Sequence, residues 1–438
     1  MRFISTKSSI SPVSLAEAVN CCVAPDGGLY MPETIPSIPR ALFNNIGEMK
    51  LQDIAYVVAT AFFGSEVPAS VLKNIVDESF AFDAPLVKVG DTYVLELFHG
   101  PTLTFKDYGA RFMARLMKYI DRRDTTPRRN VLVATMGNTG AAAANGFFRL
   151  DGVGVCVLYP YGALTKTQTA QFTALGENIH PLEVAGTVED CKHLVQAALA
   201  DQTLSDLHLT GANSINLARL IPQVTFSMYA FAQLSARGVQ NTSGMQISLP
   251  CGNLSNLVAA AMARQMGLPM GRLIAATNMN DQLAPLIAGA EFGSKLHNPM
   301  RTLAPSVDMS SPSGWPRLIH LYNDDLRRLS SDITAAPAVD DDTIRETVNR
   351  LRDEFGYNID THGALAYAAM QRCADPSAPK VVFATGHPAK QSEIIKAITG
   401  AEPERPEQMM QFISVRRHST IIPPTLPALR KHLISINR

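Results

Sequence analysis

The sequence predicts an α/β protein in which two doubly wound parallel-sheet domains follow a helical N-terminal cap. After about residue 90, short apolar segments alternate with helix-forming segments, which is typical of parallel strands joined by helices. Three of these apolar segments run directly into turns rich in Gly, Asn, Ser and Thr, at the strand ends where such sheets bind ligands. The expected strands are 93–98, 130–135, 153–158, 245–250, 273–277 and 380–385.

The expected domain boundaries follow from where the alternation of apolar strands and helices begins along the chain. Residues 1–90 are expected to form the cap, which a Gly-Gly turn at 26–28 and prolines at 32, 36 and 39 punctuate. Residues 91–110 and 246–400 are expected to form the large domain, residues 111–245 a smaller mobile α/β domain, and residues 401–438 a C-terminal extension. Within the large domain, the amphipathic pattern of 341–355 predicts a helix whose apolar face points to the core.

The composition favours a neutral enzyme that acts on a small molecule. The chain has 438 residues, of which 46% are hydrophobic and 18% charged, and its formal net charge is zero. It is therefore long enough for two or three domains, and it lacks the basic surface that nucleic acid or an anionic membrane requires. Its six cysteines show no CxxC pair and no zinc-type histidine spacing, so we expect reduced thiols and no metal site.

The ends and the apolar runs of the chain bear on its location. The N-terminal residues lack the apolar region of a secretion signal, and no apolar run approaches the length of a membrane span. We therefore expect a cytoplasmic protein that does not bind membranes. The sequence leaves its oligomeric state open between a monomer and a homodimer.

One lysine, Lys106, stands at the junction between an apolar strand and an amphipathic helix. The strand ends at the Gly-Pro step 100–101, and the helix carries apolar residues at three- and four-residue spacing, namely Phe105, Phe112, Met113, Leu116 and Met117. In the first helical turn, the helix dipole and the apolar neighbours both disfavour the ammonium form. Lys106 is therefore the candidate catalytic residue, with a neutral amine available for a Schiff base near neutral pH. A solvated surface lysine is the alternative interpretation.

A second candidate site is the turn 252–256, which follows a predicted strand and opens a helix. Its free backbone N–H groups and the helix dipole suit a phosphate, although an ordinary helix N-cap is the alternative. The sequence has no Walker A loop and no GxGxxG turn after the first strand, so a nucleotide site is unsupported. A Schiff-base lysine and a separate phosphate cradle together fit pyridoxal phosphate (PLP), which supplies an electron sink.

The chain contains a series of motifs that resembles, in order and spacing, the motifs of the threonine synthase family. This family belongs to fold type II, the tryptophan-synthase-β-like group of PLP enzymes. The motifs are STKSSISPVSLAEAV, APDGGLYMPETIP, HGPTLTFKDYGARF, ATMGNTGAAAA, ANSINLAR, LPCGNLSN and ATGHPAK. The resemblance runs over nearly the whole chain. It implies the two-domain PLP fold type II, PLP as the cofactor and an amino acid, phosphorylated in the family reaction, as the substrate.

The resemblance also implies roles for individual residues. Lys106 matches the Schiff-base lysine and would move protons at the substrate carbons, and the turn 252–256 would hold the cofactor phosphate. The hydroxyl of Thr385 would face the pyridine nitrogen, and Asn138 would recognise the 3-oxygen of the cofactor. The expected cofactor-binding residues are Lys106, Asn138, Gly252, Asn253, Leu254, Ser255, Asn256 and Thr385. The expected substrate-binding residues are Thr102, Met136, Thr139, Gly140, Asn213 and Arg219.

Arg219 is the candidate for part of the substrate-phosphate site, because a dianionic phosphate needs charged donors. A surface arginine that caps a helix is the alternative interpretation of this residue. Asn138, Thr139 and Gly140 lie at an expected helix N-terminus, where Thr139 and Gly140 would suit a substrate carboxylate. Plain helix capping is the alternative there as well.

The family reaction converts O-phosphohomoserine and water to threonine and phosphate by γ-elimination and β-addition, so the resemblance implies a PLP-dependent carbon-oxygen lyase. The sequence departs from the family in turns expected to face the substrate. The family's SGDTG reads MGNTG at 136–140, and two basic positions after the third expected strand are Tyr161 and Ala163. Losing such donors can change substrate preference by orders of magnitude.

Two other hypotheses therefore stay open beside threonine synthase. One is a specialised PLP enzyme that performs γ- or β-replacement, or elimination, on a differently activated amino acid. The other is a non-catalytic scaffold that binds an amino-acid-like molecule, which the presence of Lys106, Gly252 and Thr385 disfavours.

Overall fold

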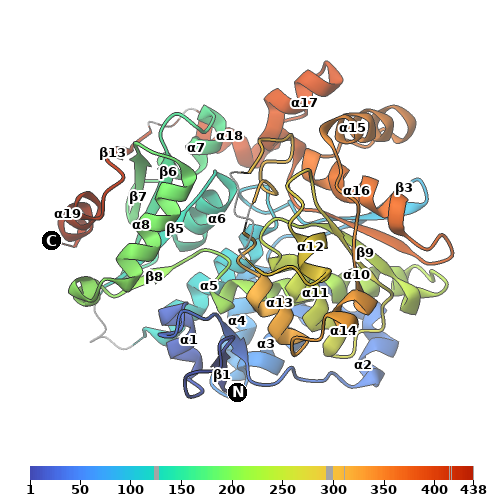
Figure 1. Cartoon of the computed structure of the whole chain (residues 1–438), viewed down its shortest axis with the longest axis horizontal. Coiled ribbons are helices and arrows are strands. Elements are labelled where there is room, and N and C mark those ends of the chain that lie inside the picture. The colour runs from blue at the N-terminus through green and yellow to red at the C-terminus, as the bar shows by residue number, and fades with distance from the viewer. Residues whose placement is uncertain (123–127, 293–298, 310, 414, 416, 438) are drawn as a thin grey trace.

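The computed structural model describes residues 1–122, 128–292, 299–309, 311–413, 415 and 417–437. Its framework is two sheets that lie side by side, one of six strands and one of five (Figure 1). In order across the first sheet, the strands are β11 (Ile333–Ala335), β10 (Leu273–Ala276), β9 (Gln246–Pro250), β12 (Lys380–Ala384), β4 (Thr92–Glu96) and β3 (Leu86–Val89). In the second, they are β13 (Thr420–Ile422), β7 (Ile179–Val184), β6 (Val153–Pro160), β5 (Arg129–Ala134) and β8 (Leu209–Gly211).

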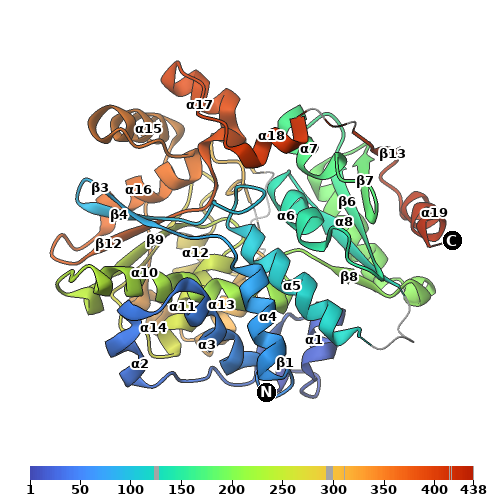
Figure 2. The ribbon, with the colours of Figure 1, turned by 180° about the vertical axis from the view of Figure 1, so that it is seen from behind.

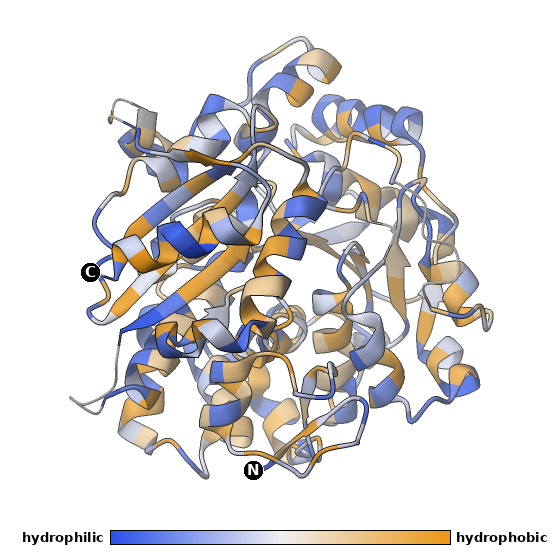
Figure 3. Ribbon diagram, turned by 60° about the vertical axis from the view of Figure 1, so that its left-hand side comes forward, coloured by the Kyte–Doolittle hydropathy of each residue, from blue (hydrophilic) through white to orange (hydrophobic). Residues whose placement is uncertain are grey.

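The strands pair in the manner that the sequence predicts for a doubly wound fold. Within both sheets, as far as the chain is described, β3 is antiparallel to β4 and the other pairings are parallel. Strands β5, β6, β10 and β12 are buried along their whole length, since helices cover both faces of a parallel sheet. In Figure 3 the central parts of these strands are mostly hydrophobic, whereas the surrounding helices show both colours.

The N-terminal segment combines a small sheet with helices that pack beneath the large sheet. Strands β1 (Phe3–Ser5) and β2 (Tyr30–Pro32) are antiparallel, and the helices are α1 (Leu15–Cys21), α2 (Arg40–Asn45), α3 (Leu51–Phe63) and α4 (Ala69–Ser79). Helix α4 packs on both α3 and α5 (Lys106–Ile120), as the view from behind shows (Figure 2). The cap therefore packs on the helix that begins at Lys106, and α3 also packs on α10 (Val224–Ala236).

The other helices cover the two sheets. Helices α6 (Asn138–Phe147) and α8 (Val188–Ala200) pack on β5 and β6, and α16 (Thr361–Cys373) packs on β9, β10 and β12. The remaining helices are α7 (Lys166–Thr173), α9 (Leu217–Leu220), α10 (Val224–Ala236), α11 (Ser255–Gln265), α12 (Leu283–Ile287), α13 (Trp315–Leu321), α14 (Leu326–Asp332), α15 (Asp341–Phe355), α17 (Ser392–Thr399), α18 (Glu407–Ile413) and α19 (Leu426–Ile436).

Helix α5 approaches two neighbouring helices so closely that only glycine fits at the contacts. A Cβ atom on Gly109 would lie 2.8 Å from the carbonyl oxygen of Arg219, just inside α9. A Cβ atom on Gly146 of α6 would lie 2.9 Å from the carbonyl carbon of Ala110. These contacts fix α5 between the two sheets and bring the backbone of α9 against its first turns.

The expected α/β fold with two parallel sheets is confirmed, and the six expected strands lie within two residues of their predicted ends. Helix α15 spans the predicted residues and buries Ile344, Val348 and Leu351 toward α16, so its core-facing orientation is confirmed. The other strands were not predicted, because they are short or mix polar with apolar residues: β1, β2, β3, β7, β8, β11 and β13.

The sheets divide the chain differently from the expected domain boundaries at two places. Strand β3 lies in the expected cap but pairs with β4 of the six-stranded sheet, because the turn at Gly90 folds it back into a hairpin. Strand β13 lies in the expected C-terminal extension but pairs with β7 of the five-stranded sheet. We retain the large and small units as a proposal, with these two strands assigned to the sheets that hold them.

Across the described residues, no helix has the length and apolar character needed to cross a membrane. The same part of the chain contains no group of three or more His, Cys, Asp or Glu side chains arranged to hold a metal ion.

Gly146→Ala is expected to destabilise the protein by about 1–3 kcal/mol, the usual cost of overpacking. An alanine in a helix ordinarily adds up to about 1 kcal/mol over glycine, but here its methyl group would overlap the backbone of Ala110. Urea unfolding measures the change. Asn74→Ala, on the exposed side of α4, is the control and should be neutral or slightly stabilising. A more stable Gly146→Ala protein would contradict the close packing of α5 and α6.

Candidate active site

Three turns that the sequence singles out lie side by side at one edge of the six-stranded sheet. They follow β4, β12 and β9, which are neighbours in the sheet and run in the same direction. Their carboxyl ends therefore open onto one place, which is where doubly wound sheets bind ligands. The loop after β4 carries Lys106, the turn after β12 begins with Thr385, and the turn after β9 contains Gly252.

The loop before Lys106 is clamped to the end of β12. The N–H of Phe105 donates to the carbonyl oxygen of Thr385 at 3.1 Å, and the hydroxyl of Thr104 donates to the same oxygen at 3.2 Å. Lys106 is the first residue of α5, as predicted, and its Nζ lies 4.5 Å from the centre of the Phe105 ring. The fold thus fixes the lysine between the end of β12 and the start of a helix.

The surroundings of Lys106 favour the neutral amine. The pKa of Lys106 is lowered to about 7, mainly by burial and further by the nearby charges of Arg219 and Lys390. Asp360 and Asp107 act in the opposite direction. A neutral, nucleophilic amine is therefore available near neutral pH, which is the condition for attack on a carbonyl carbon.

Asp107, the next residue, is a buried carboxylate held by Thr102. The hydroxyl of Thr102 donates to Oδ1 of Asp107 at 2.5 Å, and the N–H of Thr102 donates to Oδ2 at 2.8 Å. Burial raises the pKa of Asp107, and these two hydrogen bonds oppose the rise. Thr102 was expected to contact substrate, but its fully buried hydroxyl is used inside the protein to hold Asp107.

The turn after β9 has the form of an anion cradle. Leu254 has a positive φ of 62°, and α11 starts directly after it. Within the described residues, the N–H groups of Gly252 to Asn256 have no hydrogen-bond partner. Oδ1 of the buried Asn256 also lacks a partner there. The side chain of Asn253 instead joins this turn to Ser214 and Ser313.

The turn after β5 presents a second helix N-terminus from the five-stranded sheet. The hydroxyl of Thr135 accepts hydrogen bonds from the N–H groups of Gly137 and Gly140, each at 2.9 Å. Asn138 and Thr139, between these glycines, begin α6 and are partly exposed, so their N–H groups are available to an anion. Met136 is 44% exposed at the same turn.

Arg219 is buried rather than placed on the surface. Its Nη1 donates to the carbonyl oxygen of Ala212 at 2.5 Å, and its Nε has no partner among the described residues. Burial lowers the pKa of Arg219 to about 10, with Asp107 acting in the opposite direction. A buried cation with an unused donor is suited to binding an anion.

Asn213 was expected to contact substrate, but its amide is paired with the backbone. Its Nδ2 donates to the carbonyl oxygen of Ala134 at 3.0 Å, and its Oδ1 accepts the N–H of Ala134 at 3.3 Å. The amide thus holds the residues before α9 against the end of β5.

Sequence reasoning missed several side chains that the fold brings to this region. Lys390 lies in the GHPAK turn that the sequence singles out, but it was not selected as a site residue; it is buried near Lys106. Asp360 accepts a hydrogen bond from Nδ1 of His362 at 2.8 Å and also affects the pKa of Lys106. The position of Lys390 in the turn that follows a buried strand could have identified it. The local sequence identifies Asp360 only as a helix N-cap.

Comparisons with known proteins define first the class and then the family. The family model described as "Pyridoxal-phosphate dependent enzyme" matches residues 84–386, so the protein belongs to the PLP-dependent enzymes of fold type II. The models "Threonine synthase N terminus" and "Threonine synthase, C-terminal" match residues 2–80 and 363–433. The chain belongs to the threonine synthase family.

Full-length relatives agree with this assignment. Threonine synthase of Serratia marcescens is 35% identical over 100% of both chains, and that of Escherichia coli K12 is 34% identical over 99% of this chain and 100% of its own. The crystal structure of the E. coli enzyme covers 100% of both chains with a TM-score of 0.91. A PLP-bound threonine synthase from Brucella melitensis, 30% identical, has the same coverage and TM-score. The cofactor of the family is therefore PLP.

Thr102→Val is expected to reduce stability by about 1–3 kcal/mol at neutral pH, because a buried carboxylate loses a hydrogen bond. The loss should shrink in acid: once the pH falls below the raised pKa of Asp107, the carboxyl is protonated and the missing bond costs less. Denaturant unfolding at several pH values measures this.

Thr104→Val is the matched control, since the buried hydroxyl of Thr104 donates only to a neutral carbonyl oxygen. Its penalty should not depend on pH. Equal pH dependence in the two variants would contradict the pairing of Thr102 with an ionised Asp107.

Proposed function

We propose that the protein converts O-phosphohomoserine and water to threonine and phosphate by γ-elimination followed by addition of water at the β-carbon. The observation that carries the proposal is Lys106, whose amine has a lowered pKa and lies where the carboxyl ends of β4, β9 and β12 meet. Full-length similarity to threonine synthases supports the reaction. The substrate is a small phosphorylated amino acid.

The residues present fit PLP. The unpaired N–H groups of the turn 252–256 and the α11 dipole suit the cofactor phosphate. The hydroxyl of Thr385 makes no hydrogen bond to the described residues, so it is free to face a ring nitrogen, and Asn138 would contact the 3-oxygen. When bound, PLP supplies the electron sink that stabilises negative charge at the substrate carbons. A hydroxyl does not enforce a protonated ring nitrogen, which favours elimination over transamination.

Lys106 then has two tasks. Its neutral amine would bind the cofactor aldehyde, and, once free again, the same amine would take up and return protons at the substrate carbons as a general base and acid. A pKa of about 7 suits both directions of proton transfer, because the amine is then half protonated near neutral pH.

Two parts of the site suit the two anionic groups of the substrate. The N-terminus of α6 suits the α-carboxylate through the N–H groups of Asn138 and Thr139, whereas the N–H of Gly140, expected to serve here, is already bonded to Thr135. Arg219, buried with an unused Nε, suits the phosphate. Met136 precedes the same turn, and its side chain is exposed.

The comparisons favour threonine synthase over the two other hypotheses. The substituted turn after β6 is at the surface, where Tyr161 is 60% exposed and Ala163 is also exposed. Relatives that match from end to end are threonine synthases, and nothing in the described structure favours a differently activated substrate.

The reaction is tested by mixing the PLP-loaded protein with O-phosphohomoserine in deuterated water. Proton and phosphorus NMR should show threonine deuterated at carbon and one equivalent of inorganic phosphate, because Lys106 exchanges protons with solvent. An unchanged substrate beside a visibly bound cofactor would contradict the proposed substrate.

Lys106→Ala is expected to abolish both turnover and the attachment of PLP that borohydride makes permanent. Mass spectrometry after reduction measures the attachment directly. Lys118→Ala, on an exposed turn of the same helix, should leave the attachment intact. Reducible attachment that persists in Lys106→Ala would refute the role of Lys106.

A further inference from the structure

Lys390 is a buried lysine whose ammonium group binds two neutral oxygen atoms. It lies in the short 3-10 helix Pro388–Gln391 that follows β12, and only 8% of its surface is exposed. Its Nζ donates to the carbonyl oxygen of Thr102 at 2.6 Å and to Oε1 of Gln171 at 2.5 Å. Burying a charge without an ion pair is costly, so this arrangement calls for an explanation.

The two oxygen atoms belong to different layers of the molecule. Gln171 lies on α7, which packs on α6 and β7 of the five-stranded sheet, and its carbonyl oxygen accepts a hydrogen bond from Asn145 of α6. Thr102 lies in the loop that connects β4 of the six-stranded sheet to α5. The ammonium group of Lys390 therefore connects the two sheets at the level of the active site.

The hydrogen bonds that join Gln171 to Lys390 and Thr102 continue to Asp107, the residue next to the candidate catalytic lysine. The carbonyl oxygen of Thr102 accepts the hydrogen bond from Lys390, and the hydroxyl and N–H of Thr102 hold Asp107. Asp107 is adjacent to Lys106 in the first turn of α5. A displacement of Gln171 would thus be transmitted through Lys390 and Thr102 to the residue next to Lys106.

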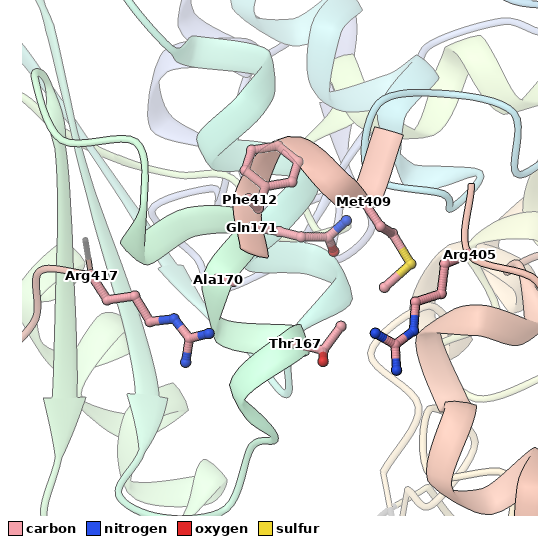
Figure 4. Close-up of a pocket in the computed structure, with 7 residues that line it drawn as sticks. All are labelled: Thr167, Ala170, Gln171, Arg405, Met409, Phe412 and Arg417. Carbon is pink, nitrogen blue, oxygen red and sulfur yellow. The ribbon is translucent and has the colours of Figure 1, made fainter. Parts of the chain in front are cut away.

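Space for such a displacement exists on the other side of α7. A cavity of about 70 Å³ lies between α7 and α18, and Gln171 borders it together with Thr167, Met409 and Phe412 (Figure 4). Nε2 of Gln171 has no partner among the described residues, so only its Oε1 holds the side chain in place. The end of the Gln171 side chain is thus attached to the molecule through Lys390.

We propose that Lys390 is a positioning residue which, held by Gln171, ties α7 to the loop before Lys106 and places a fixed positive charge beside the Lys106 amine. The proposal rests on the assignment of Lys106 as the lysine that binds the cofactor aldehyde. It explains why the charge is buried without an ion pair: two neutral acceptors hold the ammonium group without neutralising it, and the nearby Asp107 offsets its field only in part. A carboxylate partner would fix the lysine equally well but would neutralise that field.

The electrostatic surroundings agree with this role. The charged groups around Lys106 are Arg219 and Lys390, which lower its pKa, and Asp360 and Asp107, which raise it. Burial lowers the pKa of Lys390 itself to about 8, opposed by Asp107, and His387 lies close enough to interact with it. Near neutral pH Lys390 is therefore mainly charged while Lys106 is about half neutral.

The first test measures how fast the full-length apoprotein captures PLP as a function of pH, followed by the visible absorbance of the bound cofactor. Capture needs the neutral amine, so its rate rises as the pH passes the pKa of Lys106. Lys390→Met removes a positive neighbour and should move the midpoint upward by roughly one pH unit. Lys390→Arg retains the charge and should stay near the wild-type midpoint.

Two variants of Gln171 distinguish the effect of the Lys390 charge from the effect of the tether between α7 and the loop before Lys106. Gln171→Glu keeps an oxygen acceptor at the same position but cancels the field of Lys390, so the capture midpoint should rise as in Lys390→Met. Gln171→Leu removes the tether but introduces no opposite charge and leaves Lys390 its hydrogen bond to Thr102, so the midpoint should shift less than in Gln171→Glu. Because glutamate nearly matches glutamine in shape, Gln171→Glu is the variant in which we expect the smallest effect on folding.

The tether is tested by amide hydrogen exchange. The N–H groups of Leu103 and Phe105 are hydrogen-bonded in the wild type, to Gly100 and Thr385. In Gln171→Leu these amides and those of α7 should exchange several-fold faster, whereas Gln171→Glu should retain their protection.

Lys380→Met is the matched control. Lys380 is also buried, but it lies at the start of β12, the strand that precedes the 3-10 helix of Lys390, and it is paired with Asp91. This variant should alter neither the capture midpoint nor exchange in the loop before Lys106.

A Lys390→Met midpoint that coincides with the wild type would overturn the electrostatic role. Unchanged exchange in Gln171→Leu would overturn the tether. If the wild-type protein captured no PLP at any pH, the assignment of Lys106 would fail instead, and hydrogen exchange would still decide whether Gln171 ties the two layers together.

Discussion

The close packing of α5 is the constraint on which the site depends. Its glycine contacts with α9 and α6 leave no room for a β-carbon, so the helix can begin at only one place between the sheets. Because the loop before it is also bonded to the end of β12, Lys106 has little freedom of position. The same contacts bring the backbone of α9, and with it Arg219, against the helix. Backbone packing thereby sets the distance between the reactive amine and its charged neighbours.

Burial in this packed region lowers the pKa of Lys106, and the surrounding charges adjust it further. Arg219 and Lys390 are held mainly by carbonyl oxygens and by an amide oxygen, which accept hydrogen bonds without cancelling charge. Their positive potential therefore reaches Lys106 and adds to the effect of burial on its pKa. Asp107 and Asp360 limit the shift, so that the amine is balanced near neutral pH rather than permanently deprotonated. This balance is what a group that must both accept and donate protons requires.

The sequence revealed those features that local patterns encode. The strands, the start of α5 and the turn 252–256 follow from apolar periodicity and turn composition, so they could be predicted. Thr102 and Asn213 illustrate what could not: their polar groups bind Asp107 and the backbone of Ala134, the latter 79 residues away. Lys390 was missed because its role depends on a contact made by the fold: its partner Gln171 is 219 residues away in the sequence. A motif shows that a polar side chain is present, whereas only the fold shows whether that side chain is already used.

The same distinction explains why the substituted turn after β6 is compatible with a threonine synthase. A basic residue at the exposed positions of Tyr161 or Ala163 would be well solvated, and exposed ion pairs contribute only about 0–1 kcal/mol. A charged hydrogen bond in a buried site is worth roughly 1.5–3 kcal/mol. Arg219, which is 3% exposed and retains an unused donor, offers the stronger kind of contact. We therefore propose that the capacity to bind a phosphorylated substrate depends more on the buried arginine beside α5 than on charges at the rim.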